Sequence, residues 1–379
     1  MVEFDVSKYY GNQIVPLRFV MQMAPTVFIC LFGAMLEVVY RKSYAEGSAL
    51  AATSRLLQRS AQCYLLYALA VLSRVIVGDF SLSFGIRCLL LIGGTPYTDI
   101  LKFYFFILLF APLLIAFRNK FGLRTVIALA VLIHALYPAL VTIPAPPQIS
   151  GKDYIGMGTR FFIGVGDTIV GGPSLVHGLA LVLCGMVIGY ALVKIQSECE
   201  RERKIGWKVL FGLTGFALLA TILLWTNISS VNVVRDIADL TLRNENHPIY
   251  SALGLSATTI GVVLCTYLFD ILKIRCLDFV KFIGSVSLFT FSFGNILLII
   301  QPFQAMGEVE ALILFLIFGV LIAVQSWVFY GLTRKDFEQR RGYVRFFAMV
   351  VQMTMKEVNQ VIKRALAPFV NRYSRMITT

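Results

Sequence analysis

The chain has 379 residues, of which 58% are apolar and only 15% are charged. Soluble proteins carry about a quarter charged residues, so this composition and a mean hydropathy of +0.78 exclude a soluble, disordered or fibrous protein. The net charge of +13, from 34 Lys and Arg against 21 Asp and Glu, is typical of basic cytoplasmic loops in a membrane protein. Basic stripes with interleaved stacking aromatics are missing outside the apolar stretches, which argues against nucleic-acid binding. The seven cysteines are scattered without a CxxC pair, so neither a metal site nor a disulfide framework is predicted.

Nine stretches are long and apolar enough to cross a bilayer, because a helix needs roughly 20 residues to span about 30 Å of hydrocarbon. In chain order they are 21–40, 60–78, 98–117, 123–143, 174–194, 206–226, 249–271, 280–300 and 310–332. The stretch 84–94 is too short to cross and contains Arg87, so we expect a helix that lies at the interface or re-enters the protein. The predicted fold is an all-α transmembrane bundle of about nine spans over residues 1–334.

Lys and Arg are distributed unequally between the connections. Of the 34 basic residues, 25 lie in alternate connections and in the tail, namely 41–59, 118–124, 194–208, 273–281 and the residues from Arg334 onward. Since cytoplasmic loops are the basic ones, this pattern predicts an N-terminus outside and a cytoplasmic C-terminus. We find no inverted repeat of the kind seen in transporters, which argues against that class.

Two outer connections, 144–173 and 227–248, are long enough to carry function. The Pro and Gly content of the first predicts an ordered cover without regular secondary structure. The tail, 335–379, has apolar residues at helical spacing and basic residues elsewhere, which predicts an amphipathic helix at an anionic cytoplasmic leaflet. A partner-binding helix is the alternative, and Pro368 is expected to end the helix.

Ionisable side chains inside membrane spans are costly, so they indicate a candidate site. The polar residues near the outer side are Arg18, Gln22, Arg74, Asp99, Lys102 and His177. Asp99 and Lys102 are three residues apart on one helix, so they can pair with each other, and a purely structural role stays open for both. Glu37 and Asp270 lie near the inner side, within about a turn of basic loops, where helix-end salt bridges are the simpler interpretation.

Histidine is the usual proton-transfer group near neutral pH, and the chain has three. His134 and His177 lie within predicted spans, and His247 lies on the outer connection. For both span histidines, a hydrogen-bonded interior residue is the alternative to a catalytic one. GxSxG, HExxH, P-loop and GxGxxG motifs do not occur in a supporting context.

The segment PYTDILKFY, residues 96–104, followed by LLFAPLL at 108–114, resembles the membrane acyltransferases that succinylate osmoregulated periplasmic glucans, relatives of the broad acyltransferase-3 group. Shorter pieces fit the same order over roughly residues 15–330. These are 25–33 with 40–42, 55–59, 172–177 with Gly185 and Gly189, 246–248 and 283–291. The resemblance implies a protein of the bacterial inner membrane that acylates a periplasmic glycan, with an acyl-CoA-type donor and no bound cofactor.

Two features depart from that family. Its members begin with an additional helix that carries an Arg near its start and, near its outer end, the His thought to relay the acyl group; this sequence starts after that point. In the motif Gly284-x-x-Ser-Leu, the family places a His six residues beyond the Leu, whereas this chain has Gly294 followed by Asn295. Neither glycine nor asparagine can act as a general base.

Two hypotheses follow. In the first, the protein transfers a succinyl or acetyl group to a glycan, with Arg87, Asp99, Lys102 and Arg160 binding or orienting substrate and His177 as the substitute base. In the second, a catalytically inactive relative serves as a structural or accessory subunit of a larger membrane complex, as the missing histidines and the basic tail suggest. Both hypotheses require the lipid bilayer as a partner, and neither requires a metal.

Overall fold

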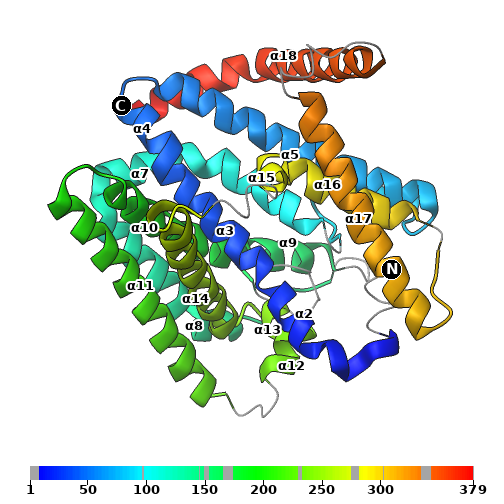
Figure 1. The fold of residues 1–379 in the computed structure, drawn as a ribbon, viewed down its shortest axis with the longest axis horizontal. Coiled ribbons are helices and arrows are strands. Elements are labelled where there is room, and N and C mark those ends of the chain that lie inside the picture. Colours follow the sequence, from blue (N-terminus) through cyan, green and yellow to red (C-terminus); the bar gives the residue numbers. More distant parts are fainter. Residues whose placement is uncertain are drawn as a thin grey trace.

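The computed structural model describes residues 8–95, 98–144, 146–148, 153–164, 174–228, 233–274, 281–301, 303–333 and 343–378. Within these ranges the chain is helical and forms no strand (Figure 1). Seven helices are long and apolar enough to cross a membrane: Val15–Ala45, Ala49–Val77, Asp99–Val141, Leu175–Ile195, Glu200–Thr226, Pro248–Ile271 and Glu308–Thr333. The predicted all-α bundle is therefore confirmed, while nine crossings and their direction stay predictions.

The first span is built from several helical pieces. After a 3₁₀ turn at Gly11–Ile14 come α2 (Val15–Gln22), α3 (Ala24–Met35), a π-helical turn at Leu36–Tyr40 and α4 (Arg41–Ala45). The helix α5 (Ala49–Val77) ends at Gly78, whose φ of 89° is a left-handed C-cap that glycine adopts without strain.

The long helix α7 (Asp99–Ala135), continued by α8 (Tyr137–Val141), covers two of the predicted spans. Its two arms meet at Gly122, whose φ of 82° and ψ of 177° lie outside helical values, and Figure 1 shows the change of direction between them. Another predicted span, 280–300, is divided into α15 (Lys281–Ser285) and α16 (Ser287–Ile300). The shortness of α16, at 14 residues, and the kink at Gly122 explain why seven candidates correspond to nine predicted spans.

Four short helices connect the long ones. They are α6 (Leu82–Leu89), α9 (Tyr154–Phe162), α12 (Val233–Ala238) and α13 (Thr241–Asn244). The predicted interfacial or re-entrant stretch 84–94 overlaps α6, which is not among the candidate spans. The prediction that 144–173 lacks regular secondary structure is wrong for α9, where the sequence between Asp153 and Ile163 contains no proline to prevent helix formation.

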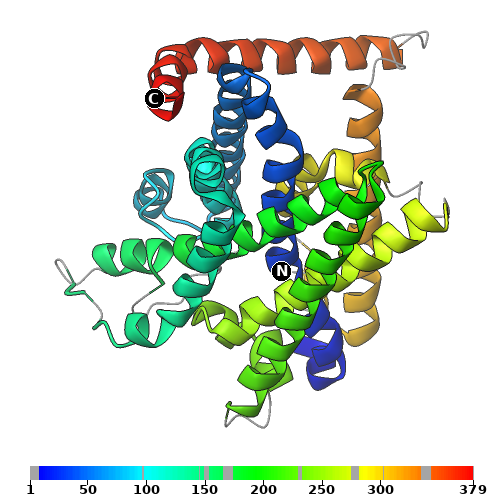
Figure 2. The same cartoon turned by 90° about the vertical axis from the view of Figure 1, so that its left-hand side faces the viewer.

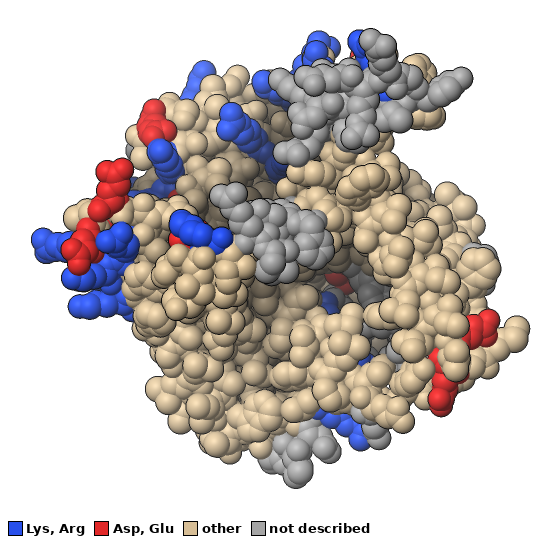
Figure 3. All heavy atoms as spheres, viewed as in Figure 1, with Lys and Arg blue, Asp and Glu red and all other residues tan. Residues whose placement is uncertain are grey.

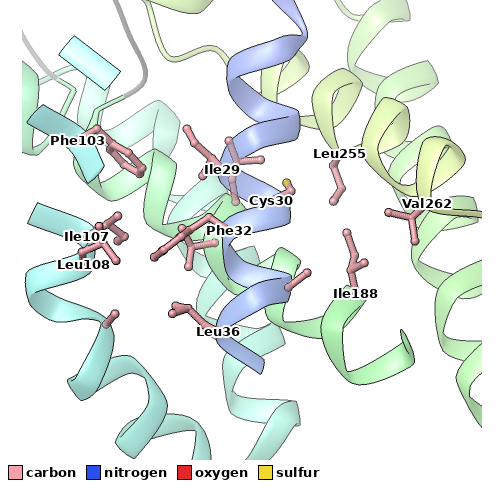
Figure 4. Packing of buried hydrophobic residues seen from close by; sticks show 14 of the residues in the cluster. Ile29, Cys30, Phe32, Leu36, Phe103, Ile107, Leu108, Ile188, Leu255 and Val262 are labelled. Atoms are coloured by element: carbon pink, nitrogen blue, oxygen red, sulfur yellow. The ribbon is translucent and has the colours of Figure 1, made fainter. Parts of the chain in front are cut away.

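The helix α3 occupies the centre of the bundle, with α7 on one side and α10 (Leu175–Ile195) and α14 (Pro248–Cys265) on the other (Figure 4). Its buried residues Ile29, Cys30 and Leu36 join one apolar core with α7, α10 and α14. At the crossing of α3 and α10, Gly33 and Gly185 lie directly against the partner helix backbone. Small residues of this kind allow close helix approach where lipid provides no hydrophobic drive between helices.

The tail forms α18 (Tyr343–Thr378), which confirms a C-terminal helix but continues through Pro368, so the predicted end at that residue is wrong. It lies across one end of the bundle, roughly perpendicular to α17 (Glu308–Thr333), as Figure 2 shows. Asn359 accepts a hydrogen bond of 2.7 Å from Gln62 of α5, and the Tyr373 hydroxyl donates to the Leu109 carbonyl at 3.0 Å. Most Lys and Arg visible in Figure 3 lie along the edges near α18, α4 and the start of α11 (Glu200–Thr226).

Candidate functional site

Polar side chains meet inside the bundle where α7 and α10 begin and α9 packs between them. Asp99, at the first position of α7, is only 4% exposed, and Lys102 is 2% exposed. The Asp99 Oδ1 atom accepts hydrogen bonds of 2.9 Å from both the backbone N–H and the hydroxyl of Thr95. The Lys102 ammonium donates to the Gly93 carbonyl at 3.2 Å and lies 4.1 Å from the centre of the Phe161 ring.

These contacts show that Asp99 and Lys102 bind different partners. Both side chains belong to the described part of the chain, and no direct ion pair joins them. The predicted pairing at a spacing of three is therefore not formed, because each charged group turns to the loop that precedes α7. The second carboxylate oxygen of Asp99 is buried and has no hydrogen-bond partner within the described residues.

All three histidines of the chain gather around Tyr137, although they lie far apart in the sequence. The ring centroids of His134 and His177 are 6.2 Å apart, and Tyr137 is 6.2 Å from His177 and 5.4 Å from His247. His134 comes from the second arm of α7, His177 from the first turn of α10, and His247 from the N-cap of α14. Three separate elements thus supply one cluster, which we call the histidine cluster.

His177 is fixed by its neighbours but keeps one nitrogen unpaired. Its Nδ1 atom lies 2.7 Å from the hydroxyl oxygen of Ser174, the N-cap of α10. The Ser174 backbone N–H in turn donates to Asn246 Oδ1 at 2.6 Å. The ring is 1% exposed, and its Nε2 atom is buried without a partner among the described residues, as is His134 Nδ1.

The helix α9 connects the histidine cluster with Lys102. Phe161 contacts the Lys102 ammonium, and Gly164, three residues later, lies beside the His177 ring. A β-carbon added at Gly164 would be 3.1 Å from His177 Cε1, and the φ of +90° there also disfavours any other residue. Arg160, on the same helix, is 4% exposed. Lys102, Arg160 and His177 are thus buried on or next to α9, and we call them the buried region; Asp99 lies three residues before Lys102 on α7.

Arg87 lies on α6, directly before Cys88. Its guanidinium donates to the Ser83 carbonyl at 3.2 Å and lies over the Phe84 ring. Next to it, burial and the nearby Asp99 carboxylate raise the pKa of Cys88 to about 11, so this thiol stays protonated and unreactive at neutral pH.

The other polar residues predicted near the outer side form local pairs. Arg18 bonds Asp239 at 3.0 Å, and Arg74 bonds Asp79 at 3.5 Å. Gln22 accepts a hydrogen bond of 3.0 Å from Arg243. These pairs connect α2 and α5 to neighbouring loops and short helices, which is a structural role.

On the predicted inner side, the salt bridge expected for Glu37 at a helix end is confirmed, and the structure adds a second one. Its Oε1 atom lies 2.7 Å from Arg41 Nη1 and 3.0 Å from Arg118 Nη2. Arg118 comes from α7, at a distance in sequence that helix spacing alone does not bring into contact. Asp270 lies in the π-helical turn Thr266–Ile271 after α14, and the described residues provide no ion pair for it.

The buried region combines two kinds of chemistry. Lys102 and Arg160 provide positive charge at low solvent exposure, where charge–charge interactions are stronger than in water. His134 and His177 provide imidazole nitrogens that can exchange or donate protons. Figure 3 shows a hollow near the centre of the displayed face with acidic and basic atoms at its floor. The described residues contain no His, Cys, Asp and Glu group suited to a metal ion.

Sequence reasoning identified His177 but missed Ser174, Asn246 and Tyr137 as its neighbours. Ser174 had a usable signal, because a serine before an apolar helical run is a typical N-cap. Asn246 and Tyr137 had none, since only the packing of α8, α10 and α14 brings them to the cluster. Comparisons with family models, curated proteins and solved structures find no match for this chain. The resemblance to glucan succinyltransferases therefore remains a prediction.

Proposed function

We propose that this integral membrane protein transfers an acyl group, succinyl or acetyl, to a hydroxyl of a glycan outside the bacterial inner membrane. The observation that carries the proposal is the buried His177 Nε2 atom, which has no partner among the described residues, on a ring beside Gly164 of the segment that also carries the buried Arg160 and contacts Lys102 through Phe161. Polar atoms buried without partners are costly unless a ligand or water satisfies them. A polar substrate is one such ligand, and a hydroxyl-rich glycan has the required donors and acceptors.

Each residue of the region has a role in this reaction. Lys102 and Arg160 attract a carboxylate, such as that of a succinyl group, and stabilise negative charge on the acyl carbonyl oxygen as the hydroxyl attacks. Within the histidine pair, His134 and His177, an unprotonated nitrogen accepts the proton of the attacking hydroxyl and passes it to the departing thiolate as the carbon–sulfur bond of the thioester breaks. Asp99 orders the turn before α7 through Thr95 and so positions Lys102. Arg87, on α6, serves substrate approach in this scheme.

The donor is an acyl-CoA-type thioester that approaches from the cytoplasmic side, and the acceptor approaches from the periplasmic side. The distribution of charge supports this direction, because basic residues concentrate in α4, in the first part of α5, at the start of α11 and on α18. In this orientation α2, α9, α12 and α13 face the periplasm.

The test compares acylated periplasmic glucan in cells that produce either the wild-type chain or a variant, in a background without other glucan acyltransferases. His177→Gln should reduce acyl substituents, measured by mass spectrometry, by about 100-fold or more, the usual range for a lost acid–base group or a lost donor to the acyl oxygen. Glu200→Gln, in an exposed ion pair with Lys204, is the control and should leave acylation unchanged. Equal acylation by wild type and His177→Gln at equal protein levels would remove His177 from the reaction.

A second candidate function is that of an inactive relative within a larger membrane complex. The exposure of α17 favours this function. In the most apolar part of α17 only 11% of the residues are buried, whereas the same part of α10 is 67% buried. Such a helix has its sides open to lipid or to helices of another subunit. Purification in mild detergent separates the two proposals. A stable assembly with other chains supports the role as a subunit, whereas a single chain that is active on its own contradicts that role.

A further inference from the structure

Ser174 has two contacts with His177 that restrict where the protons lie. Its hydroxyl oxygen accepts the backbone N–H of His177 at 3.3 Å, which caps the first turn of α10. The same oxygen lies 2.7 Å from the ring nitrogen Nδ1. Ser174 is 1% exposed, so bulk water does not offer its hydroxyl hydrogen an alternative acceptor.

Counting protons gives one arrangement that satisfies both groups. The hydroxyl hydrogen needs an acceptor, and among the described residues the acceptor within reach is His177 Nδ1. If Nδ1 carried a hydrogen instead, the hydroxyl hydrogen would be buried without a partner, at a cost of about 1–3 kcal/mol. A neutral imidazole with an accepting Nδ1 carries its hydrogen on Nε2.

A third element holds this arrangement in place. Asn246, just before α14, accepts the Ser174 backbone N–H at 2.6 Å and so fixes the position of the serine. Gly164, at the end of α9, lies beside Cε1 of the ring, next to Nε2, and leaves this edge free of any side chain of its own. The Nε2 atom has no partner in the described part of the protein.

We propose that Ser174 is a positioning residue that holds His177 as an Nε2–H hydrogen-bond donor, and that this N–H binds a carbonyl or carboxylate oxygen of a ligand. In this role His177 is not the general base, because its free nitrogen already carries a hydrogen. The nature of the ligand as an acyl compound rests on the proposed function, whereas the proton position does not. The general base is then assigned to the neighbouring His134, whose Nδ1 has no partner among the described residues.

The experiment uses the full-length protein in lipid nanodiscs with ¹⁵N-labelled histidine, at a pH where imidazole is neutral. Three histidines give few signals, and His177→Gln identifies those of His177. We expect a protonated Nε2 and an unprotonated, hydrogen-bonded Nδ1. A protonated Nδ1 in the wild type would overturn the proposal.

Two substitutions at Ser174 separate the proton effect from the capping effect. Threonine and aspartate both cap helices, so Ser174→Thr and Ser174→Asp should both fold. Threonine keeps the hydroxyl donor and should preserve the wild-type signals. An ionised aspartate can only accept, so Ser174→Asp should move the hydrogen from Nε2 to Nδ1. Identical histidine spectra for the two variants would contradict a positioning role.

The ligand is tested with sodium acetate as the probe. Acetate should shift the Nε2 signal of His177 in the wild type and in Ser174→Thr, but not in Ser174→Asp. An unshifted wild-type signal would refute the binding of a carboxylate oxygen here. These spectra need no acyl transfer, so a protein that shows the expected proton position yet never acylates glucan would refute only the proposed function.

Discussion

One buried carboxylate oxygen of Glu37 forms ion pairs with two arginines, Arg41 and Arg118, and the Glu37 side chain is 1% exposed. Removing one partner of a buried ion pair leaves an uncompensated charge, which typically costs about 3–5 kcal/mol. We therefore expect Glu37→Ala to lower the free energy of unfolding by about that amount, measured by thermal unfolding in detergent. The double variant Glu37→Ala with Arg118→Leu should recover part of the loss, since no buried guanidinium then lacks its partner.

The matched control for this pair is the exposed ion pair between Glu200 and Lys204, whose atoms are 2.7 Å apart. Exposed pairs of this kind contribute about 0–1 kcal/mol, so Glu200→Ala should have a small effect. Similar losses for Glu37→Ala and Glu200→Ala would contradict the importance of the buried contact between the π-helical turn Leu36–Tyr40 and α7.

His247 caps the start of α14, so the stability of this helix end depends on pH. Its Nδ1 atom accepts the Ile249 backbone N–H at 3.2 Å, and partial burial lowers the pKa of the imidazole below its usual value. The neutral form is thus favoured in the folded protein. At a pH above the unfolded-state pKa of about 6.5, neutral His247 makes its full contribution to stability. This contribution is lost as the pH falls through the lower pKa of the folded state.

We expect the melting temperature of the wild type to fall on acidification below about pH 6.5. Asparagine caps helices without titrating, so His247→Asn should show a smaller fall over the same range. Melting curves recorded by tryptophan fluorescence across this range provide the measurement. An equal fall in both proteins would assign the pH dependence to groups other than His247.

At the scale of elements, α3 and α10 cross through glycines. A β-carbon on Gly185 would overlap the Cys30 carbonyl, and one on Gly33 would overlap the Val182 carbonyl. Overpacking of this kind costs about 1–3 kcal/mol, so Gly185→Ala should destabilise the protein by that amount. Gly212 of α11 has no atom within 4 Å of an added β-carbon. Gly212→Ala should therefore be neutral or stabilising, because alanine is the better helix former.

Thermal unfolding of both variants in the same detergent tests this expectation. A Gly185→Ala protein as stable as Gly212→Ala would mean that the two helices can separate at this crossing without cost.

The sequence predicts most of these elements because apolar length is a local property. Except for one terminal residue each, Gly78 and Ser174, the spans 60–78 and 174–194 lie within α5 and α10. Pro368 misled the tail prediction because proline removes one backbone hydrogen bond but does not always end a long helix. The helix α9 was missed because the surrounding Pro and Gly residues suggested an irregular cover. The histidine cluster could not be predicted at all, because His134, His177 and His247 meet only through tertiary packing.

At the scale of the whole molecule, the predicted orientation has a direct test. Cys199 is exposed between α10 and α11, on the predicted cytoplasmic side, and Met306 before α17 is 91% exposed on the predicted outer side. In spheroplasts, a membrane-impermeant thiol reagent should label Met306→Cys and leave Cys199 unlabelled until the membrane is opened. The reverse pattern would invert the topology, and labelling of both sites would require an even number of crossings between them.

The turn at Gly122 decides more than the shape of one helix. A straight helix of 43 residues would be about 64 Å long, roughly twice the hydrocarbon thickness. Instead the chain turns back, so that His134 lies beside His177 while the start of the first arm lies beside α9. In the predicted nine-span topology each arm crosses the bilayer once, so this one residue with positive φ changes the parity of the crossings. The predicted side of every later element, from α10 to α18, depends on this single backbone conformation.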